Sequence, residues 1–243
     1  MGVDPLASKY PQWSPYVFVF NSPLIYVDPD GREGIVVTGS PGGHKNKSHF
    51  LVNGLYKAKA SQKHYQRKGE KTTWIVYNDP TEGQGYTQKQ IDKYTKKAAK
   101  HGITLKAVTD ASDIVDYVNE KTGGDSRKED PVTSFYYVGH ATPGDLDVGY
   151  GGTGENFEPD DFNSGAFSGG CHVNLVGGCR TTVPGWFEDS NVTQFQEILD
   201  ENSKIYGTDV TVYYSGGVIS DENLVKKNNG KIEERKGELS AKK

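Results

Sequence analysis

The chain has few cysteines and no large excess of either charge. Its 243 residues include only Cys171 and Cys179, and the formal net charge is -4. Residues 172–176 have the composition of a strand, and an extended segment of this length holds the two cysteine Cα atoms about 25 Å apart. A disulfide needs them within about 7 Å. We therefore expect two free thiols, which excludes a secreted scaffold held together by disulfides.

Long apolar runs are also missing. No apolar stretch approaches the roughly 18 residues of a membrane span, and the first 30 residues hold no basic-then-apolar signal sequence. The mildly acidic balance argues against a nucleic-acid-binding protein, although a local basic patch stays compatible with it. The composition therefore predicts a soluble protein with neither a membrane nor a nucleic acid as its partner.

The chain divides by composition into three parts. Residues 1–33 are dense in Pro, Tyr and Trp and lack helical periodicity. Extended segments of this kind usually lie against a larger surface rather than fold alone. Residues 34–71 are interpreted as a connecting arm with at most one hairpin, and residues 72–243 as a folded domain.

From residue 72 onward, strand-like and helix-like segments alternate. Runs of β-branched and aromatic residues begin near residues 72, 103, 132, 172 and 205, and segments with helical spacing cover residues 87–102, 111–124 and 191–203. This alternation predicts a parallel sheet covered by helices on both faces. The charged segment from Asp221 onward fits either a hairpin or a partly disordered tail.

Two predicted strands end in residues that can carry chemistry. The strand FYYVGH ends in Gly139-His140-Ala141, and VNLVGG ends in Gly177-Gly178-Cys179-Arg180. In open α/β sheets, ligands bind at the carboxyl ends of the strands. If the two strands are neighbours, an imidazole and a thiol lie on the same rim of the sheet.

These residue types suit hydrolysis of a peptide bond. Only the thiolate of Cys179 attacks, and the His140 imidazole can accept its proton and later protonate the leaving amine. The backbone N–H of Cys179, together with that of Ala141 or Gly139, could hold the oxyanion. Gly177 lets a peptide backbone approach the sulfur. This chemistry requires no metal and no organic cofactor.

The ordered pair SFYYVGHA and HVNLVGGCRTT resembles the caspase-like clan of cysteine peptidases, which includes caspases, gingipains, legumains, separases and CHAT domains. The resemblance covers roughly residues 72–220 and implies a caspase-like three-layer α/β sandwich with a mostly parallel sheet. It also implies Cys179 as the nucleophile and His140 as its partner. Ala141 replaces the commoner glycine, and Gly177 replaces the Gln of caspases, so no preference for aspartate is implied.

Two neighbours of the predicted dyad have alternative interpretations. Arg180 follows the nucleophile as in caspases and fits either a pocket residue or a structural ion pair. Asp221 follows the last predicted strand, where members of the clan often place a specificity residue. Acidic residues between the two motifs form either a solvated loop or a subsite for a basic side chain: Asp145, Asp147, Glu155, Asp160 and Asp161.

The segment before the domain resembles the end of an Rhs-repeat core. Pro23 is followed by four residues and then by Asp28-Pro29-Asp30-Gly31, which matches the junction that precedes the variable toxin of that family. The resemblance implies a secreted effector that is delivered into the cytoplasm of a target cell, a cognate immunity protein, and the core shell as a further partner. It also implies a self-cleavage role for Asp28 and Asp30, inactive here without the rest of the shell.

Two other functions stay open. One is a nuclease toxin built on His44, His49 and the basic residues 57–71, although no carboxylates or cysteines accompany these histidines at metal-ligand spacing. The other is a binding domain without catalysis on a caspase-like scaffold. Cys171 and His172 lie far from the predicted rim, so both are interpreted as structural.

Overall fold

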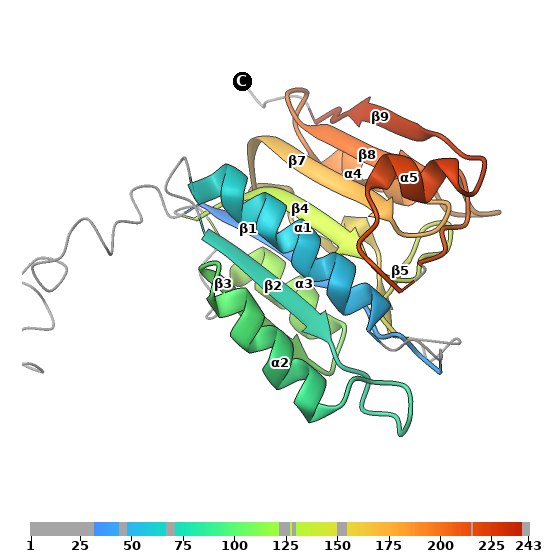
Figure 1. Cartoon of the computed structure of the whole chain (residues 1–243). Coiled ribbons are helices and arrows are strands. Elements are labelled where there is room, and N and C mark those ends of the chain that lie inside the picture. The colour runs from blue at the N-terminus through green and yellow to red at the C-terminus, as the bar shows by residue number, and fades with distance from the viewer. Residues whose placement is uncertain are drawn as a thin grey trace, which may run out of the picture.

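The computed structural model describes residues 32–43, 48–66, 71–121, 127, 130–149, 155–214 and 216–239. Within these residues, seven strands form one sheet in the order β3-β2-β1-β4-β7-β8-β9 (Figure 1). All neighbouring strands are parallel except β8 and β9. The seven strands are β1 (Glu33–Thr38), β2 (Lys71–Tyr77), β3 (Ile103–Val108), β4 (Val132–Val138), β7 (Phe167–Gly177), β8 (Lys204–Thr208) and β9 (Ile232–Lys236). Two short strands, β5 (Leu146–Asp147) and β6 (Asn156–Phe157), pair separately.

Helices cover both faces of this sheet. The described helices are α1 (His49–Gln66), α2 (Gln88–Ala99), α3 (Ser112–Glu120), α4 (Asn191–Ile198) and α5 (Asp221–Lys226). Val36 of β1 packs in one apolar cluster with residues of α1 and α2. Its neighbour Val37 packs in a second cluster with residues of α3 and α4. Successive residues of a strand point to opposite faces, so the strands read as continuous apolar runs. The predicted α/β class with a covered, mostly parallel sheet is confirmed.

The interpretation of residues 34–71 as a connecting arm was wrong. β1 lies inside the sheet between β2 and β4, and α1 packs against these strands. The apolar side chains of β1 are fully buried. Gly54 lets α1 approach the sheet, because a Cβ at this position would lie 2.2 Å from Thr38 Oγ1. The folded domain therefore includes the described residues from Glu33 to Gln66 and does not begin at residue 72.

Other boundaries lie close to those predicted. β2, β3, β4 and β8 begin within one residue of the predicted starts, and Thr87 caps α2 in a capping box with Gln90. β7 begins at Phe167, five residues before the predicted start. From Asp221 to residue 236, the chain forms neither the predicted hairpin nor a disordered tail: it forms α5 and then β9, which pairs with β8.

The strand order creates a topological switch point. The six parallel strands follow the order 3-2-1-4-5-6 when they are numbered along the chain, because β5 and β6 stand outside the sheet. In such doubly wound sheets, the crevice for ligands lies where the order reverses. Here that point is between β1 and β4, directly beside the residues that follow β4.

A buried ionic network lies at the amino ends of the strands, on the side of the sheet opposite to the switch-point crevice. The Arg127 guanidinium lies 2.9 Å from the Glu33 carboxylate, and its side chain is fully buried. The Tyr117 hydroxyl donates to the same carboxylate at 2.9 Å. These contacts fix the first residue of β1 to the segment that precedes β4. In the part of the chain that the structure describes, no helix is long and apolar enough to cross a membrane.

Candidate active site

His140 and Cys179 follow neighbouring strands of the sheet. β4 and β7 are parallel, and Val138 is in register with Gly177. Each candidate residue therefore lies two positions beyond a paired residue at the carboxyl edge. The Gly139 N–H donates to the Gly177 carbonyl at 3.3 Å, and a Cβ on Gly178 would lie 3.0 Å from Ala141 Cβ. The predicted neighbourhood of the two strand ends is confirmed.

The thiol of Cys179 is half-buried beneath the segment that follows β8. The Val212 N–H donates to Sγ at 3.4 Å, and Sγ lies 3.7 Å from the Val212 carbonyl oxygen. Burial raises the pKa of the thiol, and the Asp147 carboxylate raises it further, whereas the N–H groups of Val212 and Ala141 act in the opposite direction. The net pKa is raised, so the thiol is protonated at neutral pH and needs a base before it can attack.

Aromatic side chains hold the His140 loop. The imidazole packs edge-on against Phe50 of α1, with 5.0 Å between ring centroids, and Phe50 in turn contacts Tyr214 at 5.3 Å. The Tyr137 hydroxyl lies 2.5 Å from the His140 carbonyl oxygen and 2.7 Å from that of Asp147. These rings fix the backbone around the candidate base.

The sequence interpretation did not include the aromatic residues Phe50 and Tyr214 at this site. Phe50 belongs to α1, which had been assigned to a connecting arm. Tyr214 reaches the site because its hydroxyl donates to the Gly177 carbonyl at 3.0 Å. Neither residue stands in a motif, so a sequence signal for its role is lacking.

The three backbone N–H groups predicted to hold the oxyanion differ in the hydrogen bonds that they already make. The Cys179 N–H makes no hydrogen bond to another described residue, and the Ala141 N–H interacts with the thiolate. Gly139 was predicted as an alternative oxyanion donor, and this was wrong because its N–H is used by the Gly177 carbonyl. The two predicted donors that remain are Cys179, whose N–H makes no other bond to a described residue, and Ala141, whose N–H acts on the sulfur.

Gly177 has a packing role in place of the predicted substrate contact. The residue is buried, and a Cβ there would lie 2.2 Å from the Tyr137 carbonyl oxygen. Glycine is thus required by the close approach of β4 and β7. Arg180 has a positive φ of 52° and is exposed. Its side chain forms no ion pair with a carboxylate of the described residues, so the interpretation as a structural ion pair was wrong.

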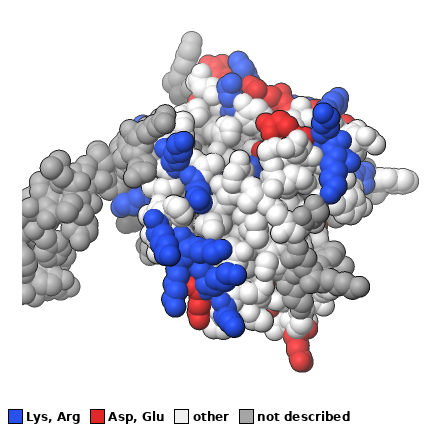
Figure 2. Space-filling view, viewed as in Figure 1, with Lys and Arg blue, Asp and Glu red and all other residues white. Residues whose placement is uncertain are grey.

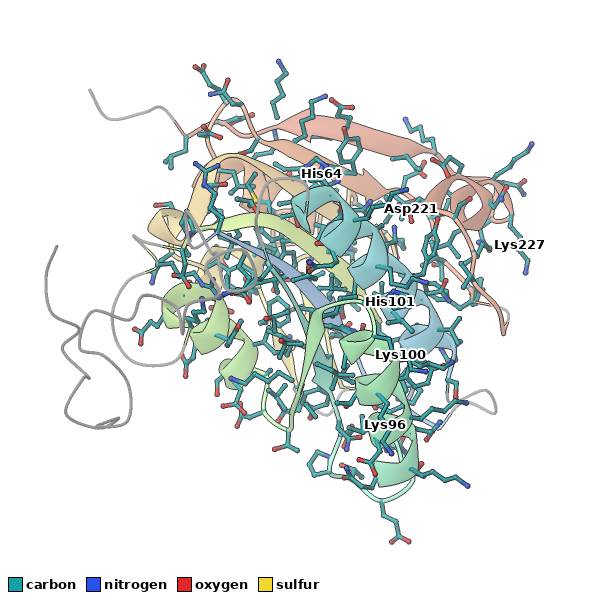
Figure 3. All side chains as sticks on the ribbon, turned by 60° about the vertical axis from the view of Figure 1, so that its left-hand side comes forward. His64, Lys96, Lys100, His101, Asp221 and Lys227 are labelled. Atoms are coloured by element: carbon teal, nitrogen blue, oxygen red, sulfur yellow. The ribbon has the colours of Figure 1, made fainter. Side chains whose placement is uncertain are left out.

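Asp221 also lies in the packing of the fold. Its carboxylate forms an ion pair with Lys57 and accepts a hydrogen bond from Asn174 Nδ2 at 2.9 Å. Figure 3 shows Asp221 between α1 and α5. The carboxylate is 16 % exposed and already has a cation, so the predicted role in substrate binding is not supported by its contacts.

The acidic loop is largely held by internal hydrogen bonds. Glu155 accepts from the Ala111 N–H at 3.0 Å, Asp145 from Asn156 Nδ2 at 2.5 Å, and Asp161 from the Glu158 N–H at 2.9 Å. Asp147 differs because its carboxylate raises the pKa of the Cys179 thiol. Burial raises the pKa of the Asp147 carboxyl, and Asp145 adds to this effect.

The structure gives no metal centre among its described residues. No group of three or more His, Cys, Asp or Glu side chains there could hold an ion. His49 is buried, and its ring packs on Phe50 at 4.2 Å. His44, Asp28 and Asp30 lie outside the described residues.

The two cysteines are free, as predicted. Cys171 lies within β7 and is fully buried, and burial raises its pKa. Cys171 and Cys179 therefore occupy one strand and the loop at its end, in very different environments. Comparison of the chain with family models, with curated proteins and with solved structures found no match.

Proposed function

We propose that this chain is a cysteine endopeptidase on a caspase-like scaffold, with Cys179 as the nucleophile and His140 as general base and acid. The observation that carries the proposal is the register of β4 and β7, which puts both residues two positions beyond paired strand residues at one edge of the sheet. The position of this edge next to the switch point supports it, because substrates of α/β proteins bind there.

The raised pKa of the Cys179 thiol defines the first step. His140 takes the thiol proton as the sulfur attacks the carbonyl carbon of the substrate. The oxyanion is held by the N–H groups of Cys179 and Ala141. The imidazolium then gives its proton to the leaving amine, which leaves a thioester on Cys179. Water attacks the thioester, His140 accepts a proton from that water, and the carboxylic acid and the free thiol are released.

The irregular segment that follows β8 lies beside the thiol and suits a polypeptide substrate. Residues Thr211–Tyr214 are non-helical, and the side chains of Thr211 and Tyr213 are exposed while Val212 is buried. The backbone groups of Thr211 and Tyr213 make no hydrogen bond to other described residues. Unpaired extended backbone is a template for an added strand. A substrate in extended conformation could therefore pair with this segment while its carbonyl lies at Cys179.

A turn near the site adds apolar contact area. Trp186 and Phe187 are 97 % and 96 % exposed, at the tip of a turn closed by the bond from the Gly185 N–H to the Glu188 carbonyl at 2.9 Å. The turn is next to the His140 loop, because a Cβ on Gly144 would lie 2.7 Å from Glu188 Oε2. Large apolar side chains of a substrate would reduce this exposure.

The biological setting that we propose follows the resemblance to Rhs proteins. The peptidase would be a toxin delivered into the cytoplasm of a target cell, where it cleaves a protein, and the producing cell would hold an immunity protein. The residues before β1 would be the end of the core, with Asp28 and Asp30 at the junction. This setting rests on the motif around Pro23 and on the analogy with the family.

The test uses the two cysteines as a matched pair. Expression of the chain in a sensitive cell should be toxic, Cys179→Ala should remove the toxicity, and Cys171→Ala should keep it when the protein accumulates to the same level. N-terminal proteomics of the intoxicated cells should show new protein termini only with an intact Cys179.

Two results would contradict the proposal. Metal-dependent nucleic-acid cleavage that survives Cys179→Ala would support a nuclease. Failure of a thiol-reactive peptide electrophile to label Cys179 in the folded protein would support a binding domain without catalysis.

A further inference from the structure

The two helical layers carry opposite charge. α2 and the residue after it expose five lysines: Lys89, Lys93, Lys96, Lys97 and Lys100. Asp92 is the one acidic residue of α2, and it accepts a hydrogen bond from Gln88 at 2.8 Å. α1 contains no acidic residue. On the other face of the sheet, α3 has three acidic residues and no basic one. The net charge of -4 is therefore an average over two unlike faces.

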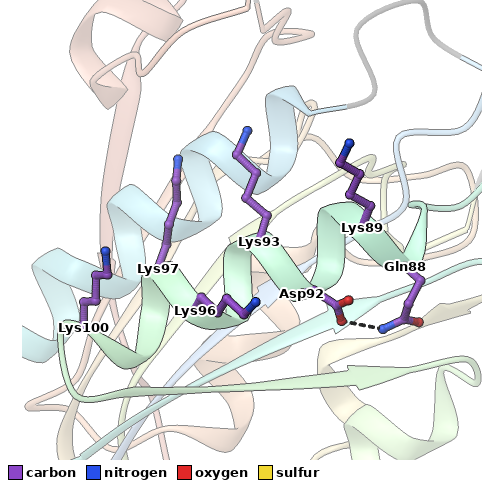
Figure 4. A pocket seen from close by; sticks show the side chains of 7 residues that line it. All are labelled: Gln88, Lys89, Asp92, Lys93, Lys96, Lys97 and Lys100. Carbon is purple, nitrogen blue, oxygen red and sulfur yellow. Dashed lines mark hydrogen bonds between the residues drawn. The ribbon is translucent and has the colours of Figure 1, made fainter.

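The lysines of α2 form a continuous basic face. Figure 2 shows the basic side chains gathered over this helix. Eleven residues separate Lys89 from Lys100, which corresponds to about 16 Å along a helix axis. Figure 4 shows Lys89, Lys93, Lys97 and Lys100 extending to the same side of α2. The five lysines, with Gln88 and Asp92, line an open hollow of about 590 Å³.

These ammonium groups have no carboxylate partner in the described part of the chain. The ion pairs formed there involve other residues, which lie on α1, in the Glu33 network and on the β8–β9 edge. Lys93 and Lys97 lie 5.9 and 5.0 Å from the centre of the Tyr94 ring. Lysines four residues apart on one helix repel each other. A bound polyanion would relieve this repulsion.

The composition of the face indicates which polyanion it suits. Protein–protein interfaces are depleted in lysine and rely on apolar anchors, whereas the aromatic residue of α2, Tyr94, is buried. α2 also contains no arginine, so it lacks the side chain that most often reads bases. Lysine ammonium groups bind phosphates as point charges. Lysines spaced about 6 Å along the helix axis can reach separate phosphates of a duplex, since each strand carries one phosphate for every 3.4 Å of the duplex axis.

We propose that the lysine face of α2 binds the phosphodiester backbone of a nucleic acid without sequence preference. This inference is independent of the peptidase proposal, because the α2 lysines are not part of the candidate active site. It also differs from the expectation that a mildly acidic chain has no nucleic-acid partner. That expectation used the net charge, which conceals the separation of charge between the two layers.

The experiment measures binding of the full chain to a fluorescein-labelled 20-base-pair DNA duplex by anisotropy between 50 and 200 mM salt. Five phosphate contacts predict a slope of about -4.5 in log K against log salt, which is a loss of affinity of about 500-fold over this range. The triple variant Lys93→Gln, Lys97→Gln and Lys100→Gln should reduce the slope by about 2.7, because each lysine contributes about 0.9. Glutamine keeps the helix propensity of lysine.

A matched control removes one lysine from α5, one from the position directly before β9 and one from β9. The variant Lys226→Gln, Lys231→Gln and Lys236→Gln changes the net charge equally and should leave the slope unchanged. A single Lys97→Gln change should lower the slope by about 0.9, which gives a second measurement if the triple variant loses its helical circular dichroism.

Three outcomes would overturn the proposal. The first is absence of salt-dependent binding at 50 mM. The second is an equal loss in both triple variants, because net charge alone would then explain it. The third is displacement of the duplex by poly-glutamate at equal concentration of charge, which would assign the face to an acidic protein.

Discussion

The amino ends and the carboxyl ends of the strands, here called the amino edge and the carboxyl edge of the sheet, are built in opposite ways. At the amino edge, Glu33 and Arg127 form a buried ion pair that is enclosed by tyrosine and threonine hydroxyls. At the carboxyl edge, the loops after β4 and β7 contribute glycines, backbone N–H groups and a half-buried thiol. At the amino edge, the buried polar groups are hydrogen-bonded to one another. At the carboxyl edge, backbone N–H donors stay available to a substrate. This difference explains why chemistry is expected at one edge only.

Alkylation of the two thiols should show the largest contrast. Cys171 is fully buried in β7, so a reagent reaches it only after extensive unfolding, which has a population of about 10⁻³ or less in a stable domain. Cys179 is half-buried in the loop after β7 and should react more than about 1,000-fold faster. Mass spectrometry after iodoacetamide treatment measures both rates, and denatured protein, in which the two rates should be similar, is the control.

Replacement of the candidate base should have the next largest effect. His140→Gln should lower the rate of peptide hydrolysis by about 100- to 10,000-fold. The residual activity should rise with pH, since the pKa of the Cys179 thiol is raised and more thiolate forms in alkali. The exposed His101 provides a control variant, His101→Gln, which should leave the rate unchanged. Hydrolysis within twofold of the unaltered protein in His140→Gln would assign the base elsewhere.

The stability of the protein should be sensitive to loss of one charge from the ionic network at the amino edge. Glu33→Gln leaves the fully buried Arg127 without its carboxylate and should lower the free energy of unfolding by about 3–5 kcal/mol. The exposed pair Lys204–Glu234 gives the matched control, because Glu234→Gln should cost less than about 1 kcal/mol. Urea unfolding measures both values, and similar costs for the two variants would contradict the contrast between the edges.

His172 should make stability depend on pH. The imidazole lies between the rings of Tyr136 and Tyr206 at 5.5 and 5.1 Å. Burial lowers its pKa from the ordinary 6.5 to about 4, and the charges of His64 and Lys57 add to this effect. The unfolded chain therefore takes up a proton below pH 6.5 that the folded chain takes up only near pH 4.

The contribution of His172 to stability is thus complete above pH 6.5 and is lost as the pH falls from 6.5 to 4. We expect a decrease of about 2–3 kcal/mol over this range. His172→Gln should remove that part of the pH dependence in urea titrations at several pH values. An unchanged pH profile in the variant would show that His172 is solvated in the folded chain.

The smallest effect is expected from Asp147. Its carboxylate raises the pKa of Cys179, so Asp147→Asn should lower that pKa by a fraction of one unit and increase the alkylation rate at pH 7 about two- to threefold. Asp113→Asn on α3 is a control at a distance from the thiol. A slower reaction in Asp147→Asn would indicate that the carboxylate assists the thiol through another group.

Some strands and helices of this fold have a clear signal in the sequence, and others do not. The strands at 72, 103, 132 and 205 were found because β-branched and aromatic runs there are bounded by turn residues. β1 was missed because its apolar run of Ile35, Val36 and Val37 is short and has glycines near both ends. α1 was missed because its sequence has a weak apolar stripe and an internal glycine, Gly54.

The first residues of β7 were missed for a similar reason. Ser168, Gly169 and Gly170 are typical of a loop, and only pairing with neighbouring strands makes them extended. For the candidate site, the sequence indicated His140 and Cys179, whereas Phe50 and Tyr214 come from segments 90 and 35 residues away from these two. Contacts between distant segments leave no periodic pattern in the local sequence.

By itself the sequence determined the alternation of strands and helices, the two free thiols and the presence of a histidine and a cysteine directly after two strands. These properties follow from local composition and from the period of the apolar residues. Tertiary structure alone decided that β1 lies beside β4, that Gly139 and Gly177 serve packing, that Asp221 is neutralised by Lys57, and that the lysines of α2 share one face of the molecule. Each of these depends on which distant segments meet, because burial and charge pairing are properties of the assembled layers.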